Sequence, residues 1–190
     1  MQIVLRRVLD NSSDLMVAAK RMLAIWGVRP ADSEFSFHVV ASGEVNNEFS
    51  VVGYIGVSPV PATHPGLDTW LSGLSLDSAR HAVSHGHSIV FAELHSLFVH
   101  PDWRHIHLSS ALVNMASSTA VTNRLTPVAS VPIHNVAAHH VFSSAGFLQF
   151  GTGGMVSTDR VRYMALPVSY RSFGHGQVHV LNPRRPNHGR

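Results

Sequence analysis

Residues 97–112 read LFVHPDWRHIHLSSAL, and this stretch decides the fold. An apolar run of strand-forming residues reaches Val99, and Pro101 ends it because proline cannot donate to a β-ladder. Serine is a favoured N-cap, so Ser109 or Ser110 is expected to open a helix. The start of a helix exposes unpaired N–H groups and a partial positive charge. The stretch therefore predicts a strand, a turn that can hold an anion, and a helix.

The segments on both sides of this stretch alternate between strand and helix patterns. Before it, the pattern predicts strands over 2–9, 35–41, 49–57 and 88–100, helices over 14–26 and 68–85, and a hairpin connection over 42–48. After it, the pattern predicts strands over 127–133, 147–150 and 161–166 and a helix that Asn135 caps. Alternation of this kind indicates an α/β fold, a mixed sheet with helices on both faces.

Composition favours one globular domain. The chain has 190 residues, of which 45% are hydrophobic. No apolar run reaches the roughly 18 residues that span a bilayer, and the first residues lack a signal-peptide pattern, so we expect a cytoplasmic protein with no membrane partner. Because cysteine is absent, disulfides, Cys-based zinc sites and a thiol nucleophile are excluded. We place the domain over 1–167 and a basic, loosely ordered tail over 168–190.

Charge and histidine content raise two further possibilities for binding. The formal net charge is +3, and much of the excess lies late, in Arg171, Arg184, Arg185 and Arg190. Such a tail could touch nucleic acid, but a solvated terminus is the preferred interpretation. The fifteen histidines suggest a metal site. However, no HExxH or other helical ligand spacing occurs, and the neighbours His139 and His140 point to different sides of a helix, so we expect no metal. A homodimer stays open.

Two blocks resemble motifs of the GNAT superfamily of acetyl-CoA-dependent N-acetyltransferases. Residues 97–104, LFVHPDWR, followed by Ser110-Ala111-Leu112, are similar to the strand and turn before the family's CoA-binding loop. Residues 135–147, NVAAHHVFSSAGF, are similar to its Asn-x-x-Ala-x-x-apolar-aromatic-x-x-x-Gly-Phe block. The resemblance covers about residues 88–150. It implies the GNAT fold with a mostly antiparallel sheet, and transfer of an acetyl group from acetyl-CoA to a small-molecule or peptide amine.

The resemblance also implies where acetyl-CoA would bind. The strand residues Leu97, Phe98 and Val99 would offer backbone groups to the pantetheine arm. Arg104, just before the helix, would pair with the pyrophosphate. The other cofactor candidates are His105, His107, Ser109, Ser110, Asn135 and Phe142. The family has a glycine-rich turn where residues 104–109 read RHIHLS, so the imidazoles either contact phosphate themselves or leave the site altered.

Glu93 and His95 are the candidate catalytic residues. They are two apart on the predicted strand, so their side chains face the same way. Counted back from Val99, Glu93 matches the general-base glutamate of histone-acetylating family members. The pair also falls on the two strand histidines of the arylalkylamine N-acetyltransferases. The resemblance therefore implies that Glu93 and His95 accept the proton of the acceptor amine. The alternative is a structural ion-pair partner and a core histidine.

The tyrosine that supplies the family's general acid is absent, because Phe142 stands at its position. Ser143, His139, a water or the more remote Tyr163 would have to replace it, while Phe142 packs against the core or the cofactor. The altered turn and the missing tyrosine leave two other functions open. One is a GNAT-fold binding module without catalysis, and the other is a Mom-like relative that modifies nucleic acid.

Overall fold

The computed structural model describes residues 3–30, 36–45, 48–61, 63–73, 91–156 and 159–167. Within these ranges the strands are β1 (Ile3–Val8), β2 (Phe37–Val45), β3 (Glu48–Pro59), β4 (Phe91–Val99), β5 (Thr126–Pro132), β6 (Leu148–Val156) and β7 (Asp159–Ala165). They form one sheet in the order β1-β2-β3-β4-β5-β7-β6. The β4–β5 pair is parallel and the other described pairs are antiparallel. The predicted mixed, mostly antiparallel sheet is confirmed.

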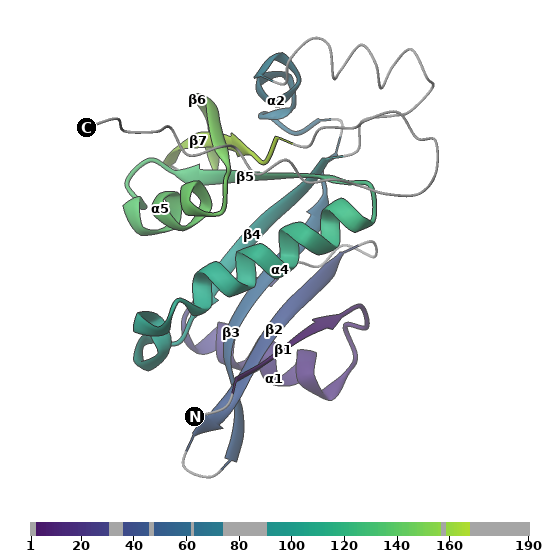
Figure 1. The fold of residues 1–190 in the computed structure, drawn as a ribbon, viewed down its shortest axis with the longest axis vertical. Coiled ribbons are helices and arrows are strands. Elements are labelled where there is room, and N and C mark those ends of the chain that lie inside the picture. The colour runs from purple at the N-terminus through teal and green to yellow at the C-terminus, as the bar shows by residue number, and fades with distance from the viewer. Residues whose placement is uncertain are drawn as a thin grey trace, which may run out of the picture.

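Helices cover both faces of this sheet (Figure 1). They are α1 (Asp14–Ile25), α2 (Leu67–Gly73), α4 (Leu108–Thr122) and α5 (Val136–Ser144), with a 3₁₀ helix, η1 (Pro101–Ile106), before α4. Neighbouring residues of β2 place their side chains on opposite faces of the sheet. Val39 packs in the core that contains α4, and Val40 packs in the core that contains α1. This alternation follows from the two-residue period of a strand. None of the helices in the described ranges is long and apolar enough to cross a membrane.

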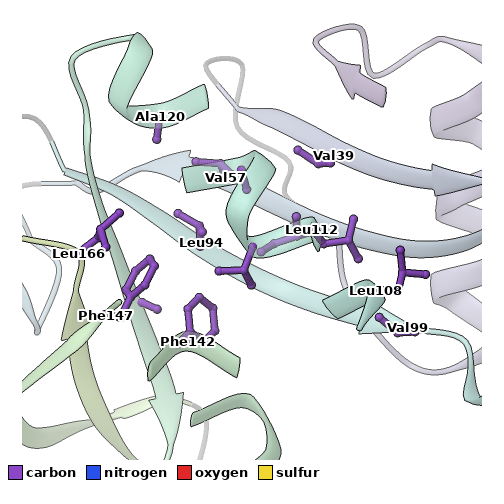
Figure 2. Close-up of a cluster of buried hydrophobic side chains, with 14 of the residues drawn as sticks. Val39, Val57, Leu94, Val99, Leu108, Leu112, Ala120, Phe142, Phe147 and Leu166 are labelled. Carbon is purple, nitrogen blue, oxygen red and sulfur yellow. The ribbon is translucent and has the colours of Figure 1, made fainter. Parts of the chain in front are cut away.

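The long helix α4 packs its apolar side on the middle of the sheet. Leu108, Leu112, Ala116 and Ala120 recur every four residues and are all buried. Residues four apart lie on one face of an α-helix. Figure 2 shows Leu112 of α4 in the same cluster as Leu94 of β4. The stripe of α4 therefore packs in the same core as the apolar side chains of β4.

Several predicted boundaries are wrong. The strand predicted over 147–150 is longer and is observed as β6, Leu148–Val156. The connection over 42–48 is shorter than expected, because β2 and β3 stay paired as far as Val45 and Glu48. Gly43 is a strand residue: a Cβ there would lie 2.5 Å from the Trp103 ring, so the glycine makes room for the tryptophan. The helix α4 begins at Leu108, not at Ser109 or Ser110.

Several predicted segments fall partly or wholly outside the described residues, among them single residues of 2–9 and 35–41 and two residues of 42–48. The predicted helix over 68–85 is described only as far as Gly73, within α2. The predicted strand over 88–100 is described from Phe91 to Val99. The proposed tail over 168–190 lies wholly outside.

Leu112 offers a test of the packing between α4 and the sheet. Its side chain is fully buried, so Leu112→Ala should lower the free energy of unfolding by about 2–5 kcal/mol through lost burial and a residual cavity. The control is Leu9→Ala, because Leu9 is 63% exposed. Urea denaturation of both variants would check this. Equal stabilities of the two variants would contradict the described packing.

Candidate active site

The strands β4 and β5 run together only briefly. Their parallel ladder joins three residue pairs and ends at Glu93↔Val128. β4 continues to Val99 and β5 to Pro132, so the strands part beyond Glu93. Figure 1 shows the two strands diverging. Backbone N–H and C=O groups require hydrogen-bond partners. The edge of β4 that leaves β5 can therefore pair with an extended ligand.

A β-bulge interrupts β4 inside this diverging stretch. Ser96 and Leu97 lie opposite the single residue Ile55 of β3, and Ser96 has a positive φ of 55°. Leu94 before the bulge and Val99 after it both pack in the core that contains α4. They lie an odd number of positions apart, which a regular strand would place on opposite faces. The bulge therefore resets which side chains of β4 face α4.

Glu93 lies on the sheet face opposite α4, next to polar groups from other segments. Its carboxylate oxygen is 3.4 Å from Nε2 of His64. Burial would raise the pKa of Glu93. Polar contacts from His64 and Ser130 outweigh burial and hold that pKa below its ordinary value. Glu93 is therefore an ionised carboxylate at neutral pH.

His64 presents an N–H to Glu93. Its Nδ1 accepts a hydrogen bond from the backbone N–H of Gly66 at 3.0 Å. A ring nitrogen that accepts carries no proton, so the proton of this neutral imidazole is on Nε2, the atom that faces Glu93. The ring stacks on Trp70 with a centroid distance of 4.9 Å. The segment before α2 therefore supplies an oriented donor to the carboxylate.

Tyr163 lies near the same carboxylate. Its ring packs on Gly66, where a Cβ would lie 2.5 Å from it, and contacts Trp70 edge-on at 5.5 Å. Burial raises the pKa of Tyr163, and the negative charge of Glu93 raises it further. The hydroxyl is buried without a hydrogen-bond partner in the described part of the chain. Tyr163 thus keeps its proton at neutral pH.

His95 makes two hydrogen bonds through its ring. Nε2 lies 2.9 Å from Oγ of Ser58, and Nδ1 lies 3.0 Å from Oγ of Ser96. Burial lowers the pKa of His95, and the nearby Glu93 opposes this only in part. The imidazole is therefore neutral at neutral pH. The two sequence candidates lie on one strand, Glu93 as a carboxylate and His95 as a neutral imidazole, and each contacts residues that were not among the sequence candidates.

The turn before α4 carries the predicted phosphate-binding residues. Arg104 is exposed, and its Nε donates to the carbonyl of Val99 at 3.3 Å. His105 and His107 are exposed as well. His107 precedes α4 with φ 58°, in the left-handed region, where a glycine has no steric cost. A turn that favours glycine thus contains histidine, and its imidazole projects from the start of the helix.

The other cofactor candidates take several positions. Leu97 and Val99 pack toward the α4 core. Phe98 is on the opposite side, in the cluster that contains α1. Ser109 and Ser110 are half-buried in the first turn of α4. Because these side chains are packed or half-buried, a ligand would contact the backbone of β4 and the first turn of α4 instead.

Asn135 and Phe142 have structural roles in the second block. Oδ1 of Asn135 accepts the backbone N–H of Ala138 at 3.0 Å, so Asn135 caps α5 as predicted. Phe142 is buried and meets Phe147 edge-on at 5.1 Å (Figure 2). Of the two roles expected for Phe142, core packing is the one these contacts support. Phenylalanine cannot donate a proton.

Comparison with protein families gives a match to the acetyltransferase (GNAT) family over residues 14–147. The chain belongs to the GNAT family. The match includes the diverging strands, the turn and both sequence blocks. The match begins at residue 14, whereas the resemblance identified in the sequence begins at about residue 88.

Solved structures share the fold of this GNAT chain. NAA60 of Arabidopsis thaliana in complex with acetyl-CoA superposes with a TM-score of 0.64 at 16% identity, covering 86% of this chain and 97% of that one. A chain of the NatC complex bound to Gag peptide and CoA gives 0.63 at 14% identity, with 89% and 100% covered. Naa50 of Arabidopsis thaliana with the bisubstrate analogue CoA-Ac-MVNAL gives 0.54 at 17%, with 87% and 98% covered. A comparison with curated proteins gives no match.

Three residues of this GNAT site were missed in the sequence. Ser58 follows an apolar strand pattern, and His64 lies in a Pro-rich loop with no motif. Ser96 sits between two candidate segments of one strand, and its bulge leaves no mark in the hydrophobic pattern. A cross-strand pairing of β3 with β4 would have pointed to Ser58, because it is the partner of Glu93.

The half-buried, neutral His95 should make stability depend on pH. Because the pKa of His95 is lowered in the folded protein, the unfolded chain takes up a proton there first as pH falls through about 6.5. The unfolded state then binds more protons, so the free energy of unfolding falls as pH falls. His95→Gln lacks this contribution, so any stability advantage of the wild type over the variant should shrink between about pH 7.5 and about pH 5.5.

Urea titrations across that pH range measure the difference. The control is His140→Gln, because His140 is exposed on α5. If the curves of the wild type and His95→Gln ran parallel, the lowered pKa of His95 would be refuted.

Proposed function

We propose that this GNAT protein transfers an acetyl group from acetyl-CoA to the amine of a small molecule or peptide, with Glu93 and His95 as proton acceptors. The observation that supports this best is a carboxylate and a neutral imidazole, each able to accept a proton, on one face of β4 at the point where β4 leaves β5. The proposal draws on NAA60 solved with acetyl-CoA and on Naa50 solved with a bisubstrate analogue.

In this proposal the diverging edge of β4 binds the pantetheine arm. A ladder that ends at Glu93 leaves backbone groups between Leu94 and Val99 for an extended ligand. The 15-residue helix α4 follows this edge after the short 3₁₀ helix η1. Its first N–H groups and its dipole favour an anion such as pyrophosphate. The guanidinium of Arg104, exposed beside that helix start, adds a charged donor.

The reaction needs a neutral amine, because a protonated nitrogen has no electron pair for attack. Glu93 or His95 takes the proton, the nitrogen bonds to the carbonyl carbon of the thioester, and the carbon–sulfur bond breaks. Positioning contributes as well, since a bound amine and thioester react as one molecule. The two bases differ in environment: Glu93 is charged and held by His64, whereas His95 is neutral between two serines.

The departing thiolate needs a proton. Phe142 cannot give one and is packed in the core. Among the alternatives from the sequence, Ser143 is exposed and His139 half-buried on α5. Tyr163 keeps its proton because its pKa is raised. The raised pKa makes this hydroxyl a weaker acid toward a thiolate, so the case for Tyr163 rests on its position near Glu93 and not on its acidity.

The first test concerns acetyl-CoA binding. Arg104→Ala should weaken affinity about tenfold, since one charge-assisted hydrogen bond is lost. Arg21→Ala is the matched control, because Arg21 is exposed on α1, on the other sheet face. Isothermal titration calorimetry measures both. Absence of wild-type binding at millimolar acetyl-CoA would favour the non-catalytic binding module instead.

The second test concerns the bases. Glu93→Gln and His95→Gln should each lower turnover by about a hundredfold or more, the usual effect of losing a general base. Acetyl-CoA affinity should change little, because neither side chain lies at the turn before α4. Mass spectrometry with an amine panel measures turnover, and Glu44→Gln, an exposed carboxylate on β2, is the control. Near-normal turnover of both variants from pH 6 to 9 would return Glu93 and His95 to structural roles.

A further inference from the structure

A chain of hydrogen bonds passes through His95. Oγ of Ser36 lies 2.7 Å from Oγ of Ser58, which lies 2.9 Å from Nε2 of His95. On the other side, Nδ1 of His95 lies 3.0 Å from Oγ of Ser96, and that hydroxyl donates to the carbonyl of Arg29 at 2.6 Å. The chain thus links β3, β4 and the segment after α1.

The fixed end of this chain sets the direction of every bond in it. A carbonyl oxygen only accepts, so the single hydroxyl proton of Ser96 is committed to Arg29. Ser96 must then accept from Nδ1–H of His95. A neutral imidazole has one N–H, so Nε2 is unprotonated and accepts from Ser58. Ser58 already donates its hydroxyl proton to His95, so it accepts a hydrogen bond from Ser36.

The neutral state of His95 has independent support. Burial lowers the pKa of its imidazole, with the charge of Glu93 acting in the opposite direction. The side chain of Arg29 is exposed, and only the backbone carbonyl of Arg29 takes part in the chain of hydrogen bonds. The lone pair of Nε2, the atom that must act if His95 is a base, is therefore covered by the hydroxyl of Ser58.

Ser58 stands beside both candidate bases. It is the cross-strand partner of Glu93 in the β3–β4 ladder, so the two side chains share a sheet face. Its hydroxyl is half-buried, at the level where β4 leaves β5. A hydroxyl oxygen accepts two hydrogen bonds, and Ser36 takes one of these positions. One acceptor position of Ser58 remains for a substrate N–H.

We propose that Ser58 is a catalytic residue that relays the proton of the acceptor amine to His95; this rests on the proposed acetyl transfer. The N–H bond of the amine breaks as an O–H bond forms on Ser58. The original O–H bond of Ser58 breaks as an N–H bond forms on Nε2 of His95. The amine keeps its electron pair and attacks the thioester, Ser58 ends as a hydroxyl, and His95 ends as an imidazolium beside Glu93.

The relay is tested with three variants of the whole protein. Ser58→Ala removes the hydroxyl, Ser58→Thr keeps it on a residue that suits a strand, and Ser36→Ala removes only the outer serine. With acetyl-CoA and an accepted amine, we expect Ser58→Ala to lower turnover about tenfold to a hundredfold, less than a complete loss of the base. Ser58→Thr and Ser36→Ala should stay within a few-fold of the wild type. Acetyl-CoA affinity should be unchanged in all three.

Two further measurements separate a relay from a purely structural role. A proton inventory in H₂O and D₂O mixtures should give two protons in flight for the wild type and one for Ser58→Ala. Nitrogen NMR of labelled histidine should show the Nδ1–H tautomer of His95 in both proteins, because Ser96 fixes it. Near-normal turnover of Ser58→Ala, an unchanged proton inventory, or acetylated Ser58 trapped as an intermediate would each overturn the relay.

Failure of the relay can be told from failure of the proposed function. If the wild type acetylates no amine, or if Glu93→Gln and His95→Gln both keep their turnover, the proposed function fails. If His95→Gln loses turnover while Ser58→Ala keeps it, acetyl transfer stands and His95 takes the proton without Ser58.

Discussion

The early end of the β4–β5 ladder is the constraint on which the site depends. If β4 and β5 stayed paired, the backbone N–H and C=O groups of β4 between Leu94 and Val99 would be hydrogen-bonded to β5. Here the ladder ends at Glu93↔Val128, and the bulge at Ser96 redirects the rest of β4. The core beneath continues without a break, because α4 covers β4 on one face. Divergence therefore costs hydrogen bonds at the backbone but little packing, and a ligand can restore the hydrogen bonds.

Local signals predicted most of the fold. The cap at Asn135 and the stop at Pro101 each act within one turn of the chain, so sequence alone finds them. The wrong boundaries come from contacts between distant segments. Gly43 looked like part of a turn, but it stays in β2 because the Trp103 ring fills the space where its side chain would be. His107 starts α4 with left-handed backbone geometry and no side-chain cap, which no capping pattern predicts.

The site was predictable only along one strand. Glu93 and His95 could be found from their distance to Val99, because strand periodicity and a family motif both act along the sequence. Their partners could not. Ser58 comes from the register of β3 against β4, and that register depends on the bulge. His64 comes from the segment before α2, where Trp70 stacks on its ring. The family membership is thus recorded in the sequence, whereas the hydrogen-bond directions that decide proton movement appear only in three dimensions.

The two bases of the proposed reaction are prepared by opposite means. Glu93 keeps its charge despite burial because donors surround it, so its lone pairs are partly occupied and its basicity is low. Burial lowers the pKa of His95, so His95 is neutral and is also a weak base. Its Nε2, however, contacts the hydroxyl of Ser58, which can give one proton and take up another. A proton moved to His95 would create a cation close to the Glu93 carboxylate, and the attraction between them would offset part of the cost of burying it. Glu93 can therefore assist proton removal without binding the proton itself, which gives the carboxylate and the imidazole separate roles.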